Sequence, residues 1–90
     1  MTKYLIESIE SKRPDYKNKW YSRVIGKTCE IASIEEGVWG AYLLIYGVVD
    51  YDYADMPMRY RTTPVLKTEE KDGVLTIETM NSIYKLKECK

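Results

Sequence analysis

The side chains best suited to recognition chemistry are aromatic and acidic residues in the middle of the chain, followed closely by arginines. Between Thr28 and Met58 the sequence has no lysine or arginine. This stretch instead carries Trp39, Tyr42, Tyr46, Tyr51, Tyr53, Glu30, Glu35, Glu36, Asp50, Asp52 and Asp55. Arg59, Tyr60 and Arg61 come directly after it. Tyrosine, tryptophan and arginine dominate binding surfaces because they present large, rigid contact areas at little entropic cost.

This composition predicts a protein-binding surface. If residues 50–53 are extended, successive side chains alternate between the two sides of the strand. Tyrosines would then project from one side and aspartates from the other, just before the arginines. The predicted contact residues are Trp39, Asp50, Tyr51, Asp52, Tyr53, Arg59, Tyr60 and Arg61. The competing interpretation is that tyrosines replace phenylalanine, which the chain lacks, in the core. It applies most to Tyr42, Tyr46 and Tyr84, which lie in expected strands, and less to the residues beside the polar loop.

A nucleic-acid or nucleotide interface is the alternative, because small barrels combine aromatic platforms with basic grooves. The N-terminal residues Lys17, Lys19, Trp20, Tyr21 and Arg23 interleave the required types. Residues 1–27 carry a net charge of +4, residues 28–58 carry −6 and residues 59–90 carry +2. The whole chain has a net charge of zero and a pI near 6.3. Binding that depends on neutralising many phosphates is therefore disfavoured, although a small basic patch could hold one short nucleotide.

Catalytic and metal chemistry find little support. The chain has no histidine, the side chain most often used for general acid and base catalysis near neutral pH. Its five glycines do not form a phosphate loop or a dinucleotide fingerprint. Asp50, Asp52 and Asp55 resemble the start of a calcium loop, but the required glycine and glutamate are missing. We expect a protein that is not an enzyme and has no cofactor and no metal.

The length of 90 residues predicts a single domain over residues 1–90. The polar N-terminal segment does not resemble a secretory signal. The longest apolar run, residues 38–49, is shorter than the roughly 20 residues that span a bilayer. A cytoplasmic protein without a membrane partner is expected, and the oligomeric state stays open. Cys29 and Cys89 are expected as free thiols, with Cys29 half-buried in a strand.

The C-terminal segment predicts a β-hairpin. Residues 74–80 and 83–87 alternate apolar and polar around Asn81 and Ser82. With Met80 opposite Ile83, Glu78 would face Lys85 as an opposite-charge pair. Leu75, Ile77, Tyr84 and Leu86 would then share one face.

Further strands are expected upstream. Asp72 and Gly73 indicate a turn that pairs residues 65–69 with residues 74–80. Pro64 should interrupt the strand between Arg61 and Val65. Residues 28–34 and 41–46 predict a second hairpin, with the second arm apolar on both faces. Residues 3–11 fit a strand better than a helix, and a short helical turn is expected within residues 14–25.

Five or six short strands in 90 residues predict an all-β fold, a small barrel of the SH3-like or OB-like kind. The compact terminal meander favours the SH3-like form. The sequence cannot otherwise choose between these topologies.

The run Arg61-Thr62-Thr63-Pro64-Val65, together with Gly73 and the segment 76–86, resembles the closing half of small uncharacterised proteins of bacterial phages and mobile elements. Gly26-Lys27 and the segment 40–43 fit the same pattern. The resemblance carries no established activity. It implies a compact gene product that modulates or inhibits a host defence macromolecule by binding it.

Overall fold

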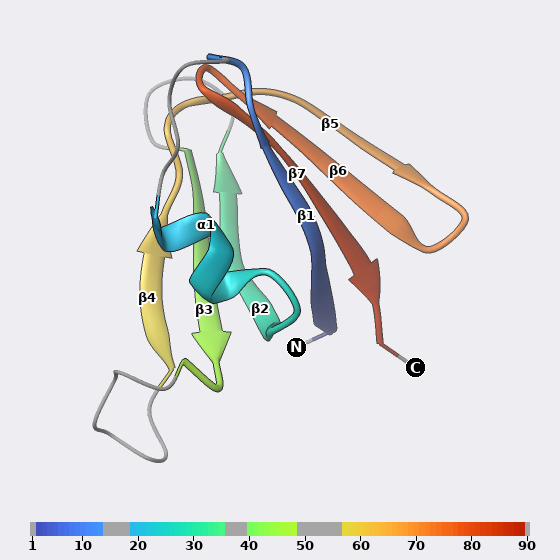
Figure 1. The fold of residues 1–90 in the computed structure, drawn as a ribbon. Coiled ribbons are helices and arrows are strands. Elements are labelled where there is room, and N and C mark those ends of the chain that lie inside the picture. The colour runs from blue at the N-terminus through green and yellow to red at the C-terminus, as the bar shows by residue number, and fades with distance from the viewer. Residues whose placement is uncertain (1, 14–18, 36–39, 49–56, 90) are drawn as a thin grey trace.

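The computed structural model describes residues 2–13, 19–35, 40–48 and 57–89, which form one antiparallel sheet and one short helix (Figure 1). In chain order the elements are β1 (Lys3–Ser11), α1 (Lys19–Val24), β2 (Thr28–Glu35), β3 (Gly40–Tyr46), β4 (Met58–Arg61), β5 (Val65–Lys71), β6 (Val74–Thr79) and β7 (Ser82–Glu88). The all-β prediction is confirmed, with seven strands among the described residues instead of five or six. The N-terminal strand and the short helical turn are confirmed as well.

The strands follow the order β4-β3-β2-β1-β7-β6-β5. β4 and β5 are therefore the two edges of the sheet, although only residues 62–64 separate them in the chain (Figure 1). We call this three-residue connection the crossover. Both predicted hairpins and the interruption at Pro64 are present.

The expectation of a closed barrel is wrong, because the two edge strands do not pair with each other. The backbone groups of the crossover instead form hydrogen bonds with β3 and with the β6–β7 turn. Thr62 N donates to Ala41 O at 2.9 Å, and Met80 N donates to Pro64 O at 3.0 Å. Proline has no N–H to offer a ladder. The crossover therefore joins the two edges covalently at one end of the sheet, while β4 and β5 run without a shared ladder.

One face of the sheet carries the core, and we call it the inner face. Apolar side chains alternate toward it along β3, β6 and β7, as the two-residue strand period requires. The buried apolar residues are Ile6, Ile9, Val24, Cys29, Ala41, Leu43, Ile45, Met58, Val65, Leu75, Ile77, Tyr84 and Leu86. Cys29 is fully buried, more than the sequence suggested, and burial raises the pKa of its thiol to about 12.

Helix α1 packs on this core through one face. Val24 is fully buried and Tyr21, three residues earlier, packs against the core cluster. Gly26, with φ of +88°, then turns the chain so that its N–H donates to Ile6 O at 2.8 Å. The helix is thereby held against β1. In Figure 1 it lies in front of β2 and β3.

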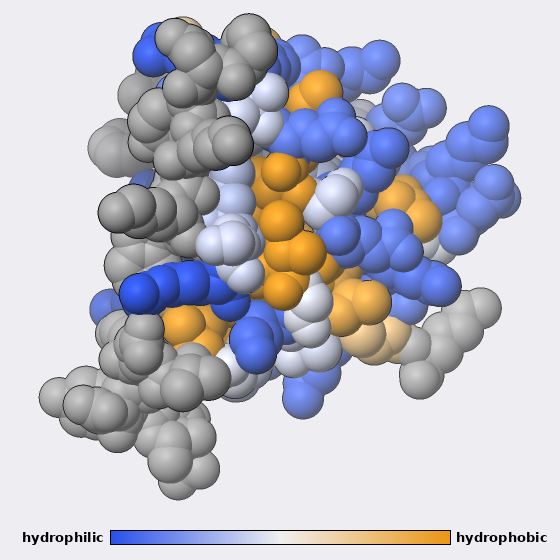
Figure 2. Space-filling model, viewed as in Figure 1, coloured by the Kyte–Doolittle hydropathy of each residue, from blue (hydrophilic) through white to orange (hydrophobic). Residues whose placement is uncertain are grey.

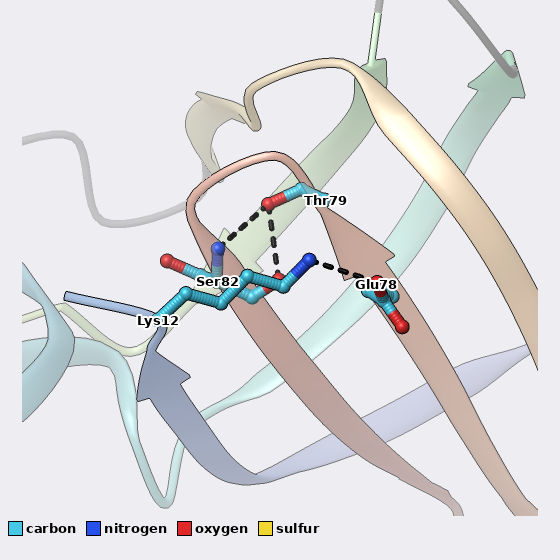
Figure 3. Close-up of polar contacts among 4 residues, drawn as sticks. All are labelled: Lys12, Glu78, Thr79 and Ser82. Carbon is cyan, nitrogen blue, oxygen red and sulfur yellow. Dashed lines mark hydrogen bonds and ion pairs between the residues drawn. The ribbon is translucent and has the colours of Figure 1, made fainter.

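The register of the β6–β7 hairpin differs from the predicted one by two residues. Glu78 faces Ile83 and Thr76 faces Lys85, so the expected pair of Glu78 with Lys85 is wrong. The turn still has two residues but is one position earlier, at Met80 and Asn81. The Thr79 hydroxyl fixes it there, because it accepts from Ser82 N at 3.0 Å and donates to Ser82 O at 3.1 Å (Figure 3). A shift of two residues leaves every side chain on its predicted face. The shared apolar face is therefore confirmed.

Candidate binding cleft

Three tyrosines from separate elements meet on the inner face near the crossover. Tyr84 of β7 lies between Tyr21 of α1 and Tyr60 of β4, with ring centroids 6.3 Å and 6.2 Å away. Both ring pairs are T-shaped, an arrangement that aromatic quadrupoles favour. The hydroxyls of Tyr60 and Tyr84 are 3.0 Å apart and form a hydrogen bond. We call these three residues the tyrosine cluster.

The environment keeps the central phenol protonated. Tyr84 is only 3% exposed, and burial, followed by the hydrogen bond with Tyr60, raises the pKa of Tyr84 above its ordinary value. The Tyr21 hydroxyl forms a hydrogen bond with the hydroxyl of Ser82, and Ser82 is buried. The tyrosine cluster is therefore a fixed, neutral, hydrogen-bonding wall.

The crossover forms the adjoining wall. Thr62 is buried, and its hydroxyl accepts from Ala41 N at 2.9 Å and donates to Thr63 O at 2.8 Å. The neighbouring hydroxyl, Thr63 Oγ1, is also buried but has no hydrogen-bond partner among the described residues. A buried polar atom without a partner is uncommon and costs free energy.

These walls enclose a cleft of about 320 Å³. Its lining residues are Arg13, Tyr21, Tyr60, Arg61, Thr62, Thr63, Asn81 and Tyr84. Among the described residues, this lining includes two arginines and no aspartate, glutamate or cysteine. The lining thus combines aromatic rings with polar side chains, a combination typical of recognition sites.

The two arginines come from different parts of the chain, and the Arg61 guanidinium lies on the opposite face of the sheet from the tyrosine cluster. Arg61 ends β4, and its guanidinium carbon lies 4.9 Å from the centre of the Tyr42 ring, within the range of a cation–π contact. Arg13 follows β1 and is exposed. Its backbone N donates to Ser11 Oγ at 3.1 Å, which fixes the chain at this point. Among the described residues, no hydrogen bond or ion pair engages the Arg13 guanidinium.

The predicted partner-binding residues are only partly brought together. Tyr60 and Arg61 line the cleft, whereas Arg59 is exposed and faces Leu44 across the ladder from β4 to β3. Tyr42 and Tyr46, expected in the core, are half-buried on the opposite face of β3 from Leu43. Tyr84 is in the core, as that interpretation expected. Trp39, Asp50, Tyr51, Asp52 and Tyr53 lie outside the described residues.

The alternative basic set has one member in the cleft, Tyr21. Arg23 is exposed on α1, which is also the helix to which Lys19 and Trp20 belong. Lys17 lies outside the described residues. The structure thus joins residues that the sequence assigned to two different surfaces.

Sequence reasoning missed the remaining lining residues, which are Arg13, Thr62, Thr63 and Asn81, and it placed Tyr84 in the core alone. One local signal was present. The two threonines follow Arg61 directly and precede a proline, so they had to form a connection rather than a strand. No local signal links Arg13 or Asn81 to them. Arg13 and Asn81 are brought close because Lys12 N donates to Asn81 O at 2.9 Å where β1 ends and β7 begins.

Within residues 2–13, 19–35, 40–48 and 57–89, no group of three or more metal-ligating side chains is found. In the same ranges no helix has the length and apolar character needed to cross a membrane. Comparison with known proteins finds no matching family model, no matching curated relative and no matching solved structure.

Proposed function

We propose that this chain is a non-enzymatic binding protein and that its recognition site is the cleft beside the crossover. One observation carries the proposal. Three tyrosine rings, from α1, β4 and β7, meet beside one cleft whose lining also includes Arg13, which follows β1. Tyrosine and arginine are the residues that contribute most at binding hot spots. The relation of this open sheet to SH3-like or OB-like barrels stays a prediction of the sequence.

The first candidate partner is a host macromolecule, and specifically a protein. The sequence resemblance to small phage and mobile-element proteins supports this choice, as does the density of aromatic side chains. The remaining proposed contacts of the same partner are Trp39, Asp50, Tyr51, Asp52 and Tyr53. The two aspartates would add negative charge to the binding surface. Arg59 would contact the partner beyond the cleft, from the neighbouring position on β4.

A second candidate, a nucleotide or nucleic acid, is favoured by a specific observation. Among the described residues, the cleft lining includes Arg13 and no carboxylate, so one negative charge would be attracted to it. The tyrosine rings supply the apolar surface against which a base can pack.

Affinity capture from a bacterial lysate at physiological salt, with and without nuclease, tests the proposal. The double variant Arg13→Gln/Arg61→Gln removes the positive charges of both arginines among the lining residues. Lys85→Gln, on the exposed face of β7, is the matched control because it removes an exposed charge elsewhere. We expect wild type and the control to retain the same partner and the double variant to lose it. Capture that survives in the double variant would place recognition elsewhere. Loss of the partner after nuclease treatment would favour the second candidate.

A further inference from the structure

The edge strand β5 presents an unpaired backbone edge with charges of both signs (Figure 1). It pairs with β6 on one side, and no strand among the described residues pairs with its other side. Such an edge is a template for another strand. We propose that two copies of this chain pair in antiparallel fashion along β5, with Lys67 of each copy opposite Glu69 of the other. All of β5 is described and none of it lines the cleft, so this inference does not rest on the proposed function.

The β5–β6 turn determines which backbone groups of β5 are available. Residues 72–73 form a two-residue turn with positive φ at both positions, so the flanking Lys71 and Val74 form a hydrogen-bonded pair. Hydrogen-bonded and non-hydrogen-bonded pairs alternate along an antiparallel ladder. Counting back from Lys71, the N–H and C=O groups of Thr68 and Glu70 therefore point away from β6. These are the groups that a second strand can bond.

A two-fold axis through Thr68, perpendicular to the sheet, gives the register that fits these groups. Thr68 then faces Thr68 of the second copy, and the two residues exchange backbone hydrogen bonds. Next to them, Lys67 faces Glu69 of the second copy, and symmetry repeats this pair on the other side of the axis. This is a non-hydrogen-bonded pair, the kind in which opposing side chains lie closest. The register thus joins two opposite-charge pairs to a continuous ladder.

The neighbouring registers are disfavoured by charge. Side chains alternate between the two faces of a strand, so only shifts of two residues keep the inner faces of both copies on one side. A shift in one direction puts Lys67 opposite Lys67, and a shift in the other puts Glu69 opposite Glu69. Like charges directly opposite each other destabilise a strand pair. The order of charges along β5 therefore selects one register for self-pairing.

The two charges of the proposed pair have no bonded partner within the part of the chain that the structure describes. Lys67 and Glu69 are exposed, and neither side chain forms a hydrogen bond or an ion pair there. Glu78 faces Lys67 across the ladder to β6, but it accepts a hydrogen bond from Lys12 Nζ at 2.8 Å. The chain has a net charge of zero, so two copies do not repel each other generally.

The other edge strand, β4, shows the contrast. Its charged residues are Arg59 and Arg61, which have the same sign. Self-pairing centred on any of residues 59–61 places an arginine opposite an arginine, and such charge protects an edge from pairing. On β5 the charges are self-complementary, and Leu66 beside them is 55% exposed. Pairing along β5 would therefore also remove apolar surface from water.

Sedimentation equilibrium of the full chain tests the inference, over protein concentrations from about 10 µM to 1 mM because small interfaces are weak. We expect a reversible equilibrium between monomer and dimer. Lys67→Glu and Glu69→Lys should each weaken the dimer about tenfold to a hundredfold, because each change makes both symmetric pairs repulsive. The double variant Lys67→Glu/Glu69→Lys exchanges the charges and should restore wild-type affinity. An equimolar mixture of the two single variants should form a heterodimer for the same reason.

A control variant and hydrogen exchange locate the interface. Lys85→Glu reverses an exposed charge on β7 and should dimerise like wild type. The melting temperature of each variant checks its folding, and recovery in the double variant shows that the single changes do not act through misfolding. Amide exchange of Thr68 and Glu70 should slow as the protein concentration rises. The amide of Glu69 already points toward β6, so its exchange should change less.

Three results would overturn the inference. The first is a chain that stays monomeric over the whole concentration range. The second is a dimer that neither single variant weakens, which would place the interface elsewhere. The third is a dimer that the double variant does not restore, which would show that the two positions do not face each other. Each of these results leaves the proposed function standing, because the cleft has no part in the pairing.

Discussion

The two ends of the sheet differ in the exposure of their polar side chains. At the crossover end, Thr62, Thr79 and Ser82 are polar and yet buried. Each has a hydrogen bond that replaces its lost water contacts. At the opposite end, the β5–β6 turn is made of charged residues and glycine, and most of β5 is exposed. We call this the hairpin end. Figure 2 shows hydrophilic side chains over the β5–β6 region and apolar ones toward the middle of the same face.

This comparison shows where a site can form in so small a sheet. The β5–β6 hairpin pairs its strands in one ladder and turns through charged residues and glycine, whereas the β6–β7 turn at the crossover end uses the buried Thr79 hydroxyl. The crossover cannot pair its flanking strands in one ladder, because it leaves one edge strand and enters another that is not its neighbour. The Thr62 hydroxyl adds hydrogen bonds with Ala41 N and Thr63 O to those of the backbone. The resulting polar concavity is where the cleft lies.

Substituting one glycine at each end tests this difference, and it gives the largest expected change in the free energy of unfolding. Gly40 has φ of +72° and Gly73 has φ of +79°, so both occupy the left-handed region. A Cβ on Gly40 would lie 2.4 Å from Thr62 O and 2.7 Å from Thr63 O, whereas one on Gly73 would meet nothing within 4 Å. We expect Gly40→Ala to lower the free energy of unfolding by roughly 3–5 kcal/mol, and Gly73→Ala by about 1–2 kcal/mol.

Urea unfolding of both variants checks this prediction, with Gly73→Ala as the control for backbone strain alone. The excess loss in Gly40→Ala reports the close approach of the crossover to β3. Equal losses in the two variants would mean that the crossover can move away freely, and the contrast between the ends would disappear.

The hydroxyl in the β6–β7 turn gives the second effect. Thr79→Val keeps the shape of the side chain but leaves Ser82 N and Ser82 O without their partner. The free energy of unfolding should fall by roughly 2–3 kcal/mol, because a buried donor and acceptor are both left unsatisfied. The matched change Thr76→Val, on the other face of β6, should stay within about 0.5 kcal/mol of wild type. A loss in Thr79→Val no larger than that in Thr76→Val would show that the turn does not depend on this hydroxyl.

The third effect concerns the tyrosine cluster and alkaline pH. Burial first, and then the Tyr60 hydrogen bond, raise the pKa of Tyr84 above the ordinary 10.0. An acid whose pKa is raised by folding contributes stability that is complete below its unfolded pKa and is lost as pH rises. Wild type should therefore lose stability above about pH 10, and Tyr84→Phe should lose less over that range.

At neutral pH, Tyr84→Phe removes the hydroxyl and its hydrogen bonding to Tyr60 and Tyr21, at a cost of about 1 kcal/mol, because these half-buried partners can turn to water. Unfolding titrations at several pH values, together with absorbance of the tyrosinate, measure both effects. If wild type and Tyr84→Phe show the same alkaline loss, another group must cause it.

Much of the fold follows from local patterns in the sequence. Alternation along β6 and β7 placed the correct residues on the inner face, and Asp72 with Gly73 predicted a turn in which both residues have positive φ. Pro64 marked the break between β4 and β5. These signals act within a few residues, where the two-residue period and turn chemistry operate.

What the sequence could not predict depends on contacts between distant segments. The β6–β7 register is set by the Thr79 hydroxyl and by bonds from Met80 to Pro64 and from Lys12 to Asn81. The number of strands favoured closure into a barrel. The sheet stays open because the crossover bonds to other segments and its two flanking strands do not pair. The cleft could not be predicted for the same reason. Its lining residues Arg13, Tyr60 and Tyr84 are far apart in the chain, and the strand order brings them together.

The smallest expected effect is at the surface of the crossover end. Lys12 Nζ lies 2.8 Å from Glu78 Oε2 (Figure 3), and both side chains are substantially exposed. The hydrogen bond to Lys12 lowers the pKa of Glu78 from its ordinary 4.5. A carboxyl pKa lowered by folding gives stability that is present above the unfolded pKa and is lost as pH falls through the folded one.

Exposed ion pairs contribute little to stability because water screens them and because the long side chains lose freedom when they pair. Lys12→Ala should therefore unfold at nearly the wild-type urea concentration at pH 7, and any difference should vanish at acidic pH. A large loss at pH 7 would show that this end depends on surface charge, rather than on its buried hydroxyls.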